Sequence, residues 1–311
     1  MNFKKPLFWD LPKLSLKAII LLPLTIPIIL RNIFLDYFHT KKTNKNIKTI
    51  CIGNIYLGGT GKTPLTIKIY EILTKLKIKT ATVKKFYLNQ LDEQLMLKEK
   101  TSLITSKSRK DAITAGLNQS YEALIFDDGL QDREVNYDKK IVCFKLRNWI
   151  GNGQLIPSGP LREKVSSLKK YDAVFLNGDY EETKEIEEYI KSINPKIKIF
   201  KSKYVISNKN KYDLNSKYLI FSGIGNPSDF KNILLKNNFK IYEEVIFADH
   251  HNYQESDIKK ILLTSSEKNL KILTTEKDFV KIPLNFKKHI NYISIDLIIQ
   301  NEKELTNFLI S

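Results

Sequence analysis

A glycine-rich turn followed by lysine and threonine is the stretch of this sequence best suited to bind phosphate. It reads Gly58, Gly59, Thr60, Gly61, Lys62, Thr63. Glycines let backbone N–H groups converge on phosphate oxygens, and the start of a following helix adds partial positive charge. In such a loop Lys62 reaches the β- and γ-phosphates, and the Thr63 hydroxyl is a ligand for Mg²⁺. The six residues therefore predict binding of a nucleoside triphosphate.

The segments on either side of the turn support this prediction. The apolar run Ile47–Ile52 is typical of a buried strand, and apolar residues at helical spacing follow between Leu65 and Leu76. Pro64 stands in the first helical turn, where no N–H donor is needed. The strict phosphate-loop pattern is missed because Tyr56 takes the place of its first glycine. The alternative is a glycine turn that only happens to precede a lysine; a dinucleotide fingerprint fails because Pro64 replaces its third glycine.

Two carboxylates follow another apolar run. Asp127 and Asp128 come directly after 123–126 and precede Gly129. Ligands of open α/β sheets bind at the carboxyl ends of the strands, and Mg²⁺ prefers hard oxygen ligands beside phosphate. We therefore expect Thr63, Asp127 and Asp128 to hold Mg²⁺. The alternative is a tight Asp-Gly turn of a hairpin.

Three further places carry chemically capable side chains. Asp92 and Glu93 open a short helical segment, where an acidic pair is also typical of helix capping. Two of the four histidines, His250 and His251, follow a predicted strand, so they are acid/base candidates or part of a surface turn. The long Gly- and Pro-rich stretch 151–163 exceeds what a connector needs, and its Arg162 is a candidate for phosphate contact.

Composition sets the broad class of the protein. The chain has 311 residues, 42% of them hydrophobic, and a formal net charge of +17. Such a charge indicates an acidic partner: nucleic acid, an anionic membrane or a phosphorylated substrate. Lysine, isoleucine and asparagine are abundant throughout, so the charge alone decides little. Cys51 and Cys143 lie in predicted strands without metal-binding spacing, which favours a reduced cytosolic chain.

The N-terminal segment is apolar and flanked by basic residues. Ala18–Leu30 is interrupted only by Thr25, and thirteen apolar residues are too few to span a bilayer as a helix. Pro23 and Pro27 are expected to kink a helix here. Three interpretations stay open: an anchor in the membrane interface, a core helix, and a signal sequence. We favour the interfacial anchor.

Strands and helices alternate along the rest of the chain, which predicts an α/β fold. We expect an N-terminal membrane-associated helix at 1–40, a P-loop NTPase-like α/β/α domain at 41–205, and a smaller α/β domain at 206–311. The extreme C-terminus is expected to pack back on the first domain. Signatures of GTPases and of protein kinases are absent.

Taken in order, the motifs resemble the tetraacyldisaccharide 4′-kinases of lipid A biosynthesis over nearly the whole chain. The matching segments are Gly53–Asn54 with the loop to Pro64, Asp127–Gln131, Gly151–Gly153, Gly159–Glu163, Asn177–Gly178, Gly223–Pro227, Asp249–His251 and Thr275–Asp278. The phosphate loop of that family also lacks the first glycine, and Tyr56 stands at this position here. Its Ser-Arg-Gly-Tyr run corresponds to Lys84-Lys85-Phe86-Tyr87, which is altered.

The resemblance implies a reaction and a set of residues. ATP would donate its γ-phosphate to the 4′-hydroxyl of a tetraacyldisaccharide 1-phosphate, with Mg²⁺, giving lipid IVA at the cytoplasmic face of the bacterial inner membrane. It assigns the base to Asp92, oriented by His250, with His251 a second candidate. Because these two fall in different predicted domains, we expect domain closure to bring them together. Lys62 acts on the phosphates, and Arg162, Glu163 and Asn177 are expected to contact the substrate.

Two other functions compete with this one. A membrane-associated ATPase that uses the nucleotide as a switch would share the loop but not transfer phosphate to lipid. A nucleic-acid-binding protein depends on the +17 charge alone. We therefore expect a lipid disaccharide and a membrane surface as partners, no nucleic acid, and a monomer.

Overall fold

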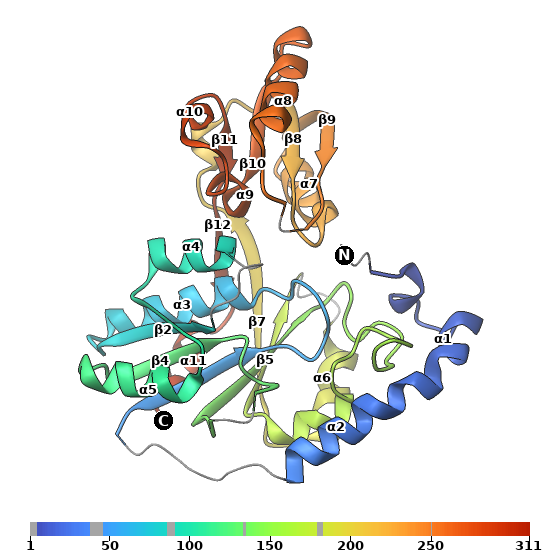
Figure 1. The fold of residues 1–311 in the computed structure, drawn as a ribbon, viewed down its shortest axis with the longest axis vertical. Helices are drawn as coiled ribbons and strands as arrows, with labels where there is room; N and C mark the ends of the chain where they lie inside the picture. The colour runs from blue at the N-terminus through green and yellow to red at the C-terminus, as the bar shows by residue number, and fades with distance from the viewer. Residues whose placement is uncertain (1–4, 38–45, 86–90, 133–134, 179–182, 250) are drawn as a thin grey trace. The chain divides into compact units, whose positions relative to one another are not determined.

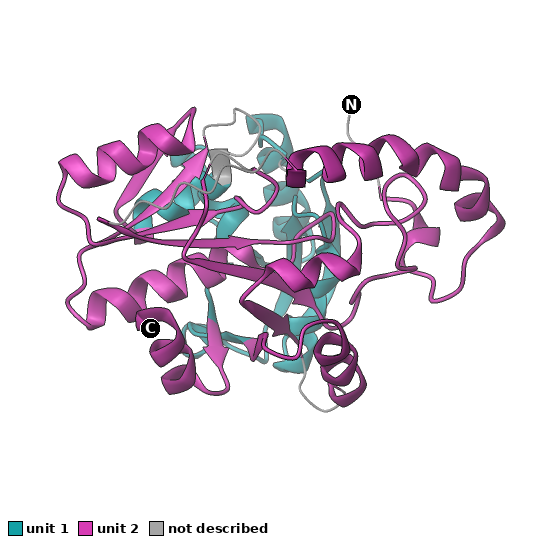
Figure 2. Cartoon of the chain, turned by 90° about the horizontal axis from the view of Figure 1, so that it is seen from below, with its two compact units in different colours: residues 1–2, 87–99, 204–296 teal, residues 3–86, 100–203, 297–311 magenta. Residues whose placement is uncertain are grey.

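The computed structural model describes residues 5–37, 46–85, 91–132, 135–178, 183–249 and 251–311. It forms two compact units (Figure 2). The larger unit consists of residues 3–86, 100–203 and 297–311, and the smaller unit of residues 1–2, 87–99 and 204–296. Residues 87–99, placed in the first domain from the sequence, thus fall in the smaller unit, and the C-terminal residues fall in the larger one.

The larger unit is built on an eight-stranded sheet with the order β12-β7-β6-β5-β1-β4-β2-β3. The pairs from β7 through β3 are all parallel. Parallel strands covered on both faces are continuously apolar, as the buried residues of β1 and β4 are. The strands are β1 Lys48–Gly53, β2 Thr80–Lys85, β3 Leu103–Ser106, β4 Ala123–Asp127, β5 Lys139–Lys145, β6 Ala173–Asn177, β7 Lys198–Ile206 and β12 Ile295–Ile299.

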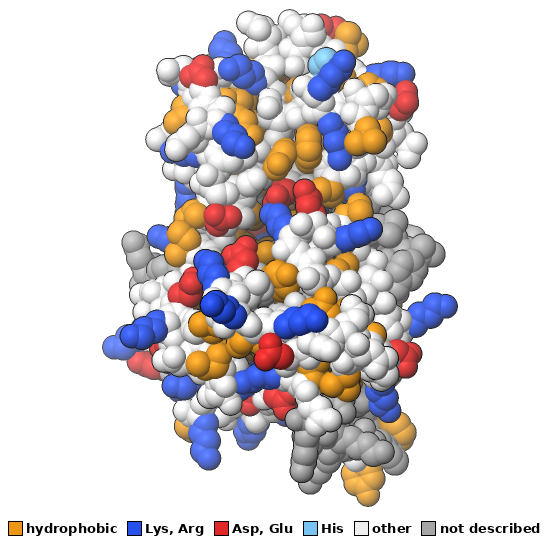
Figure 3. Space-filling view, turned by 90° about the vertical axis from the view of Figure 1, so that its left-hand side faces the viewer, with side chains coloured by type: hydrophobic (Ala, Val, Ile, Leu, Met, Phe, Trp, Pro, Cys, Tyr) orange, Lys and Arg blue, Asp and Glu red, His pale blue; other side chains and the backbone are white. Residues whose placement is uncertain are grey.

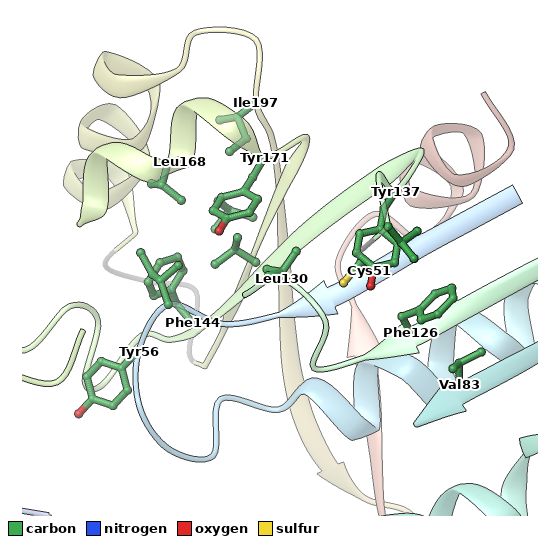
Figure 4. Close-up of a cluster of buried hydrophobic side chains, with 14 of the residues drawn as sticks. Cys51, Tyr56, Val83, Phe126, Leu130, Tyr137, Phe144, Leu168, Tyr171 and Ile197 are labelled. Atoms are coloured by element: carbon green, nitrogen blue, oxygen red, sulfur yellow. The ribbon is translucent and has the colours of Figure 1, made fainter. Parts of the chain in front are cut away.

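Helices cover this sheet (Figure 1). α3 (Lys62–Lys75) packs against β1, β2 and β4, and α5 (Arg109–Asn118) packs against β2 and β3. The others are α6 (Lys184–Ile193), the 3₁₀ helix η4 (Val165–Lys170) and α11 (Glu302–Ile310). The core between the layers includes Cys51, Phe126 and Tyr137, which lie together in Figure 4. Burying each such large apolar side chain contributes about 1.5–3 kcal/mol, so this core holds the strand ends in place.

The N-terminal segment of the larger unit is a helical stretch of 22 residues, Leu16–Tyr37. It comprises α1 (Leu16–Leu21), the 3₁₀ helix η2 (Leu22–Thr25) and α2 (Ile26–Tyr37), and follows η1 (Leu7–Trp9). The 3₁₀ turn contains Pro23 and precedes Pro27, where the sequence predicts a kink. By length and composition this stretch of 22 residues could cross a membrane. It is longer than the apolar run Ala18–Leu30, whose thirteen residues alone are too few to span a bilayer.

The smaller unit contains a four-stranded parallel sheet with the order β11-β10-β8-β9. Its strands are β8 Lys217–Ser222, β9 Lys240–Ile246, β10 Lys271–Thr275 and β11 Asn291–Ile293. Its helices are α4 Leu91–Lys100, α7 Pro227–Lys236, α8 Glu255–Glu267, α9 Glu276–Phe279, α10 Leu284–Lys287 and the 3₁₀ helix η5 Lys209–Lys211. Both units are therefore α/β layers, as the sequence predicts.

The basic side chains are dispersed over the face of the molecule drawn in Figure 3, with acidic side chains between them. A positive charge that tracks nucleic acid is gathered along one groove or stripe. On this face the +17 charge is spread out rather than concentrated.

Candidate active site

The loop between β1 and α3 is shaped by one asparagine. The Asn54 side-chain amide donates hydrogen bonds to the carbonyls of Tyr56, at 2.6 Å, and of Gly58, at 3.0 Å. These bonds curl the chain around a buried side chain before it reaches the helix. Gly61, with φ of 91°, then turns the backbone into α3, which begins at Lys62. A left-handed residue at this position favours glycine.

Two glycines of the loop lie open. Gly58 has φ of 129°, a conformation that only glycine adopts easily. Gly59 has no such constraint, and a Cβ added there would meet no heavy atom within 4 Å. Packing of the protein therefore does not require glycine at 59, whereas close approach of a phosphate to the backbone does. Thr60, next in the chain, keeps a buried Oγ1 without a hydrogen-bond partner among the described residues.

The carboxylate of Asp127 lies at the end of β4, next to the start of α3. Its Oδ2 accepts hydrogen bonds from Thr63 Oγ1, at 3.0 Å, and from Lys84 Nζ, at 2.8 Å. The side chains of Lys84 and Asp127 are almost completely enclosed. The other carboxylate oxygen of Asp127, Oδ1, has no hydrogen-bond partner among the described residues. The structure thus brings together Thr63 and Asp127, two of the three metal ligands predicted from the sequence.

Asp128 is surrounded by cations. Its carboxylate lies 3.6 Å from Lys62 Nζ and 3.5 Å from Arg162 Nη1, and Arg109 donates to its backbone carbonyl at 2.7 Å. Burial raises the pKa of the Asp128 carboxyl, but Lys62, Arg162, Lys84 and Arg109 together lower it more, so its pKa falls below the ordinary value. Asp128 is therefore an anion that a nucleotide phosphate would replace as the partner of Lys62 and Arg162.

The long loop 151–163 runs directly beside the phosphate loop. Leu57 N–H donates to the Pro160 carbonyl at 2.8 Å, and Arg162 N–H donates to the Ile55 carbonyl at 2.7 Å. Gln131 connects the same elements, because its amide donates to the Asn54 carbonyl at 2.7 Å. These backbone bonds place the Arg162 side chain at Asp128. The loop 151–163 therefore lies beside the phosphate loop, and its contribution to a functional site stays a prediction.

Tyr56, at the place of the missing first glycine, is also fixed by a network. Its hydroxyl donates to the Asp10 carboxylate and accepts from Lys5, at 3.1 Å, and from Asn148, at 3.2 Å. The tyrosine ring is buried while its hydroxyl points outward from the loop (Figure 4). The side chain that breaks the sequence pattern therefore ties the phosphate loop to the N-terminal segment.

Of the remaining predicted substrate residues, Glu163 joins this cluster through the Gln131 amide, whereas Asn177 lies elsewhere in the sheet. Glu163 is buried and accepts a hydrogen bond from the Tyr171 hydroxyl at 3.0 Å. Asn177 ends β6, two strands from β1, and its carbonyl accepts from Leu146 N–H.

The structure describes only part of the predicted catalytic base and its histidine partner. Asp92 lies in the first turn of α4, with its side chain outside the described part, and His250 lies outside the described residues. α4 belongs to the smaller unit, as do the residues that flank His250, so the two candidates are not divided between the units as the sequence suggested. The second histidine, His251, pairs with Asp257 at 2.9 Å.

α4 is held within the smaller unit by a salt bridge. Glu93 lies 3.8 Å from Lys277 of α9. The next residue, Asp278, is fully buried, accepts from Gly223 N–H at 3.1 Å and from the Thr275 hydroxyl at 2.7 Å. The Thr275–Asp278 motif thus anchors both α4 and the turn at Gly223.

Sequence reasoning gave no role in shaping the site to Asn54, Lys84 or Arg109, although the first two fall in segments compared with the family. Lys84 is a charged residue within the buried stretch of β2. Its meaning depends on strand register, since β2 and β4 pair Lys84 with Asp127. Arg109 is buried and bound to the Asp132 carboxylate and to the backbone carbonyl of Asp128, and no local sequence pattern indicates this.

The donor set fits Mg²⁺. Among the described residues, no three His, Cys, Asp or Glu side chains gather as a metal site. Magnesium is usually bound by one or two carboxylates together with waters and substrate phosphates, so such a cluster is not required. The free Asp127 Oδ1, the Thr63 hydroxyl and the Asp128 carboxylate are hard oxygen donors beside the phosphate loop.

One protein family matches nearly the whole chain. The family model "Tetraacyldisaccharide-1-P 4'-kinase" matches residues 18–311. The chain is 46% identical to a tetraacyldisaccharide 4′-kinase from Pelagibacter ubique (strain HTCC1062), covering 100% of this chain and 98% of the relative. It is 30% identical to one from Elusimicrobium minutum (strain Pei191), covering 86% and 83%.

A solved structure shares the fold. The crystal structure of LpxK from Aquifex aeolicus in complex with ATP matches with a TM-score of 0.71 and 21% identity, over 94% of this chain and 98% of that one. The resemblance predicted from the ordered motifs is confirmed by the family model and the relatives. The chain belongs to the tetraacyldisaccharide-1-P 4′-kinase family, whose members are phosphotransferases.

Proposed function

We propose that the chain transfers the γ-phosphate of ATP to the 4′-hydroxyl of a tetraacyldisaccharide 1-phosphate, giving lipid IVA. The observation that carries this is the edge of the larger unit's sheet, where an open glycine loop, Lys62 and the Asp127–Asp128 pair meet. The family and its relatives name the acceptor. The solved relative was crystallised with ATP, which supports ATP as the donor.

Positioning and charge neutralisation do most of the work in phosphoryl transfer. The amides of residues 58–63 and the Lys62 ammonium would hold the phosphates, with Lys62 leaving its 3.6 Å contact with Asp128. Arg162 would move its charge from Asp128 to the same phosphates. Mg²⁺, held by Thr63 and by Asp127 or Asp128, would neutralise charge on the phosphate oxygens.

The acceptor hydroxyl needs a base. We assign that role to Asp92, at the start of α4, with His250 as its orienting partner, on the resemblance to the family alone. The salt bridge between Glu93 and Lys277 fixes the turn that carries Asp92. Arg162, Glu163 and Asn177 stay proposed substrate residues, although Glu163 is bound to Tyr171 and contributes to positioning in this structure.

We also propose that the enzyme acts as a monomer in the membrane interface, at the cytoplasmic face of the bacterial inner membrane. The helical stretch Leu16–Tyr37 has only 11% of its most apolar window buried. It contacts the rest of the larger unit at positions 18, 25 and 32, which are seven residues, or about two helical turns, apart. Ala18 and Thr25 are buried, and Asn32 donates to the Arg162 carbonyl at 3.0 Å.

This spacing supports a helix that lies in the membrane interface rather than one that spans the membrane. A helix fixed along one face to a globular unit presents its opposite face over its whole length. That face carries Ile26, Leu30, Ile33, Phe34 and Tyr37, all exposed, the last four lining a shallow apolar hollow with Arg31. Such a surface fits burial among acyl chains with basic groups at the headgroups. The interfacial anchor is therefore favoured over a core helix.

Product analysis with γ-labelled ATP tests the reaction. With the defined lipid acceptor in vesicles, we expect label in a chloroform-soluble lipid, and loss of this label in Lys62→Ala. Lys75→Ala, an exposed lysine at the other end of α3, is the matched control and should keep full activity. Label found only in inorganic phosphate, and unaffected by acceptor, would instead identify a switch ATPase.

A further inference from the structure

Among the described cations of the site, Lys84 is the most enclosed. It lies in β2, and the register of β2 and β4 sets it directly beside Asp127. Its side chain is 2% exposed and that of Asp127 is 0% exposed, and the two form an ion pair of 2.8 Å. A buried cation therefore stands at the proposed nucleotide site.

Lys84 differs from the other cations of the site. Lys62 and Arg162 have side chains 12% and 28% exposed, and both pair with Asp128, from which a phosphate can draw them. Lys84 approaches Asp127 from the neighbouring strand, inside the sheet. If the Lys84 ammonium moved away from Asp127, two buried charges would each lose their partner, which is energetically costly. Lys84 thus stays with Asp127 when ligands come and go.

The contact with Lys84 also makes the two carboxylate oxygens of Asp127 unequal in their hydrogen bonding. Oδ2 is occupied by Lys84 and Thr63, whereas Oδ1 is buried without a hydrogen-bond partner among the described residues. Thr63 and Lys84 together fix the rotation of the carboxylate. Oδ1 is the atom left to interact with a cation or with its water.

We propose that Lys84 is a positioning residue that compensates the charge of Asp127 from within the sheet, so that this site accepts ATP before a divalent cation is present. Without Lys84, a tetra-anionic ATP would meet the uncompensated Asp127 carboxylate, and binding would depend on a divalent cation to offset it. The inference deepens the proposed function, because it concerns nucleotide binding at the same loop.

The test measures the Kd of ATP by equilibrium dialysis with labelled nucleotide, once with EDTA and once with Mg²⁺. The full chain is compared with Lys84→Met, which keeps the length of the side chain and removes its charge. We expect the ratio of the Kd in EDTA to the Kd in Mg²⁺ to increase about ten-fold or more in Lys84→Met, as a single uncompensated charge near the phosphates predicts. An unchanged ratio would overturn the inference.

Two more variants separate charge compensation from loss of structure. Asp127→Asn leaves Lys84 charged, so we expect metal-free ATP to bind about three-fold or more tightly than to the unchanged chain. Lys84→Met with Asp127→Asn removes both charges and should return metal-free binding close to that of the unchanged chain. If the double variant binds metal-free ATP about ten-fold or more weakly than the unchanged chain, Lys84 acts on the nucleotide itself and the proposal is wrong. This pair is informative even if Lys84→Met alone does not fold.

Lys62→Ala distinguishes the two levels of inference. Equal ATP affinity of the unchanged chain and Lys62→Ala in both buffers would remove the proposed nucleotide site, and Lys84 with it. Loss of binding in Lys62→Ala together with an unchanged ratio in Lys84→Met would leave the site in place and refute only the role of Lys84.

Discussion

Asn32 of α2 donates a side-chain hydrogen bond to the backbone carbonyl of Arg162, 3.0 Å away. The N–H of the same Arg162 donates to Ile55 in the phosphate loop at 2.7 Å, and its guanidinium lies 3.5 Å from Asp128. One residue therefore links the apolar N-terminal helix to the place where phosphate is proposed to bind. The proposed membrane-bound surface and the proposed active site share a physical connection.

We predict that Asn32→Ala lowers kcat/KM for the lipid acceptor about five-fold, the equivalent of one ordinary hydrogen bond. The change leaves the apolar face of α2 intact, so sedimentation with vesicles should not change. Steady-state kinetics on mixed vesicles measures the first effect and a sedimentation assay the second. Asn118→Ala, at an exposed position at the end of α5, is the control. Equal kcat/KM values in the two variants would contradict the connection.

Replacing Ile33 and Phe34 together by Glu should weaken binding to anionic vesicles about ten-fold or more. These side chains are 61% and 60% exposed, and burying each in the membrane is expected to contribute about 1.5–3 kcal/mol. The matched control replaces Leu76 and Leu117, exposed apolar residues of the larger unit away from α2, by Glu. A loss of vesicle binding as large in the control would show that added negative charge, and not the helix face, is responsible.

The glycines of the site should respond to alanine in opposite ways. At Gly129 a Cβ would lie 2.6 Å from Cys51 Sγ and 2.9 Å from the Tyr137 hydroxyl, so Gly129→Ala is expected to cost about 1–3 kcal/mol of stability. At Gly59 nothing lies within 4 Å, so Gly59→Ala should change stability by less than about 0.5 kcal/mol but weaken ATP binding about ten-fold.

Urea unfolding and ATP titration of both variants check this pair. The prediction fails if Gly59→Ala binds ATP normally, since the open space at Gly59 would then not be where phosphate approaches the backbone.

Both cysteine thiols should be silent in the folded protein. Burial raises the pKa of Cys51 to about 12, and burial likewise raises the pKa of Cys143. The thiolate is the reactive form, so a thiol reagent at pH 8 should label neither residue until the chain unfolds. ATP at about 100 times its Kd should slow the labelling about 100-fold by stabilising the folded state. Rapid labelling of the native protein would contradict the buried positions.

Local patterns made the phosphate loop and the two carboxylates predictable. Glycine, lysine and threonine at fixed spacing, and a pair of aspartates after an apolar run, carry their meaning in a few neighbouring residues. The N-terminal stretch was recognisable in the same way, although its helix extends to Tyr37, beyond the apolar run. Polar residues such as Asn32 and Asp36 hid the end of that helix, because they form contacts rather than break it.

The remaining features depend on contacts distant in sequence. Lys84 gains its meaning only from the register with Asp127, which no short window contains. β7 alternates lysine with apolar residues and ends at the predicted domain boundary, yet its Phe200 packs against Phe175 and Phe308. The membership of α4 in the smaller unit depends on packing such as the salt bridge from Glu93 to Lys277. None of these three features could be derived from composition.

The network at Tyr56 decides how a soluble form of this enzyme is best engineered. Deleting the chain up to the end of α2 would remove Lys5 and Asp10 as well as the apolar helix, and with them two of the groups that hold the nucleotide loop through the Tyr56 hydroxyl. Polar substitutions on the outer face of α2 leave those groups untouched. Deletion would therefore damage catalysis and membrane attachment together, whereas surface substitution allows each to be studied by itself.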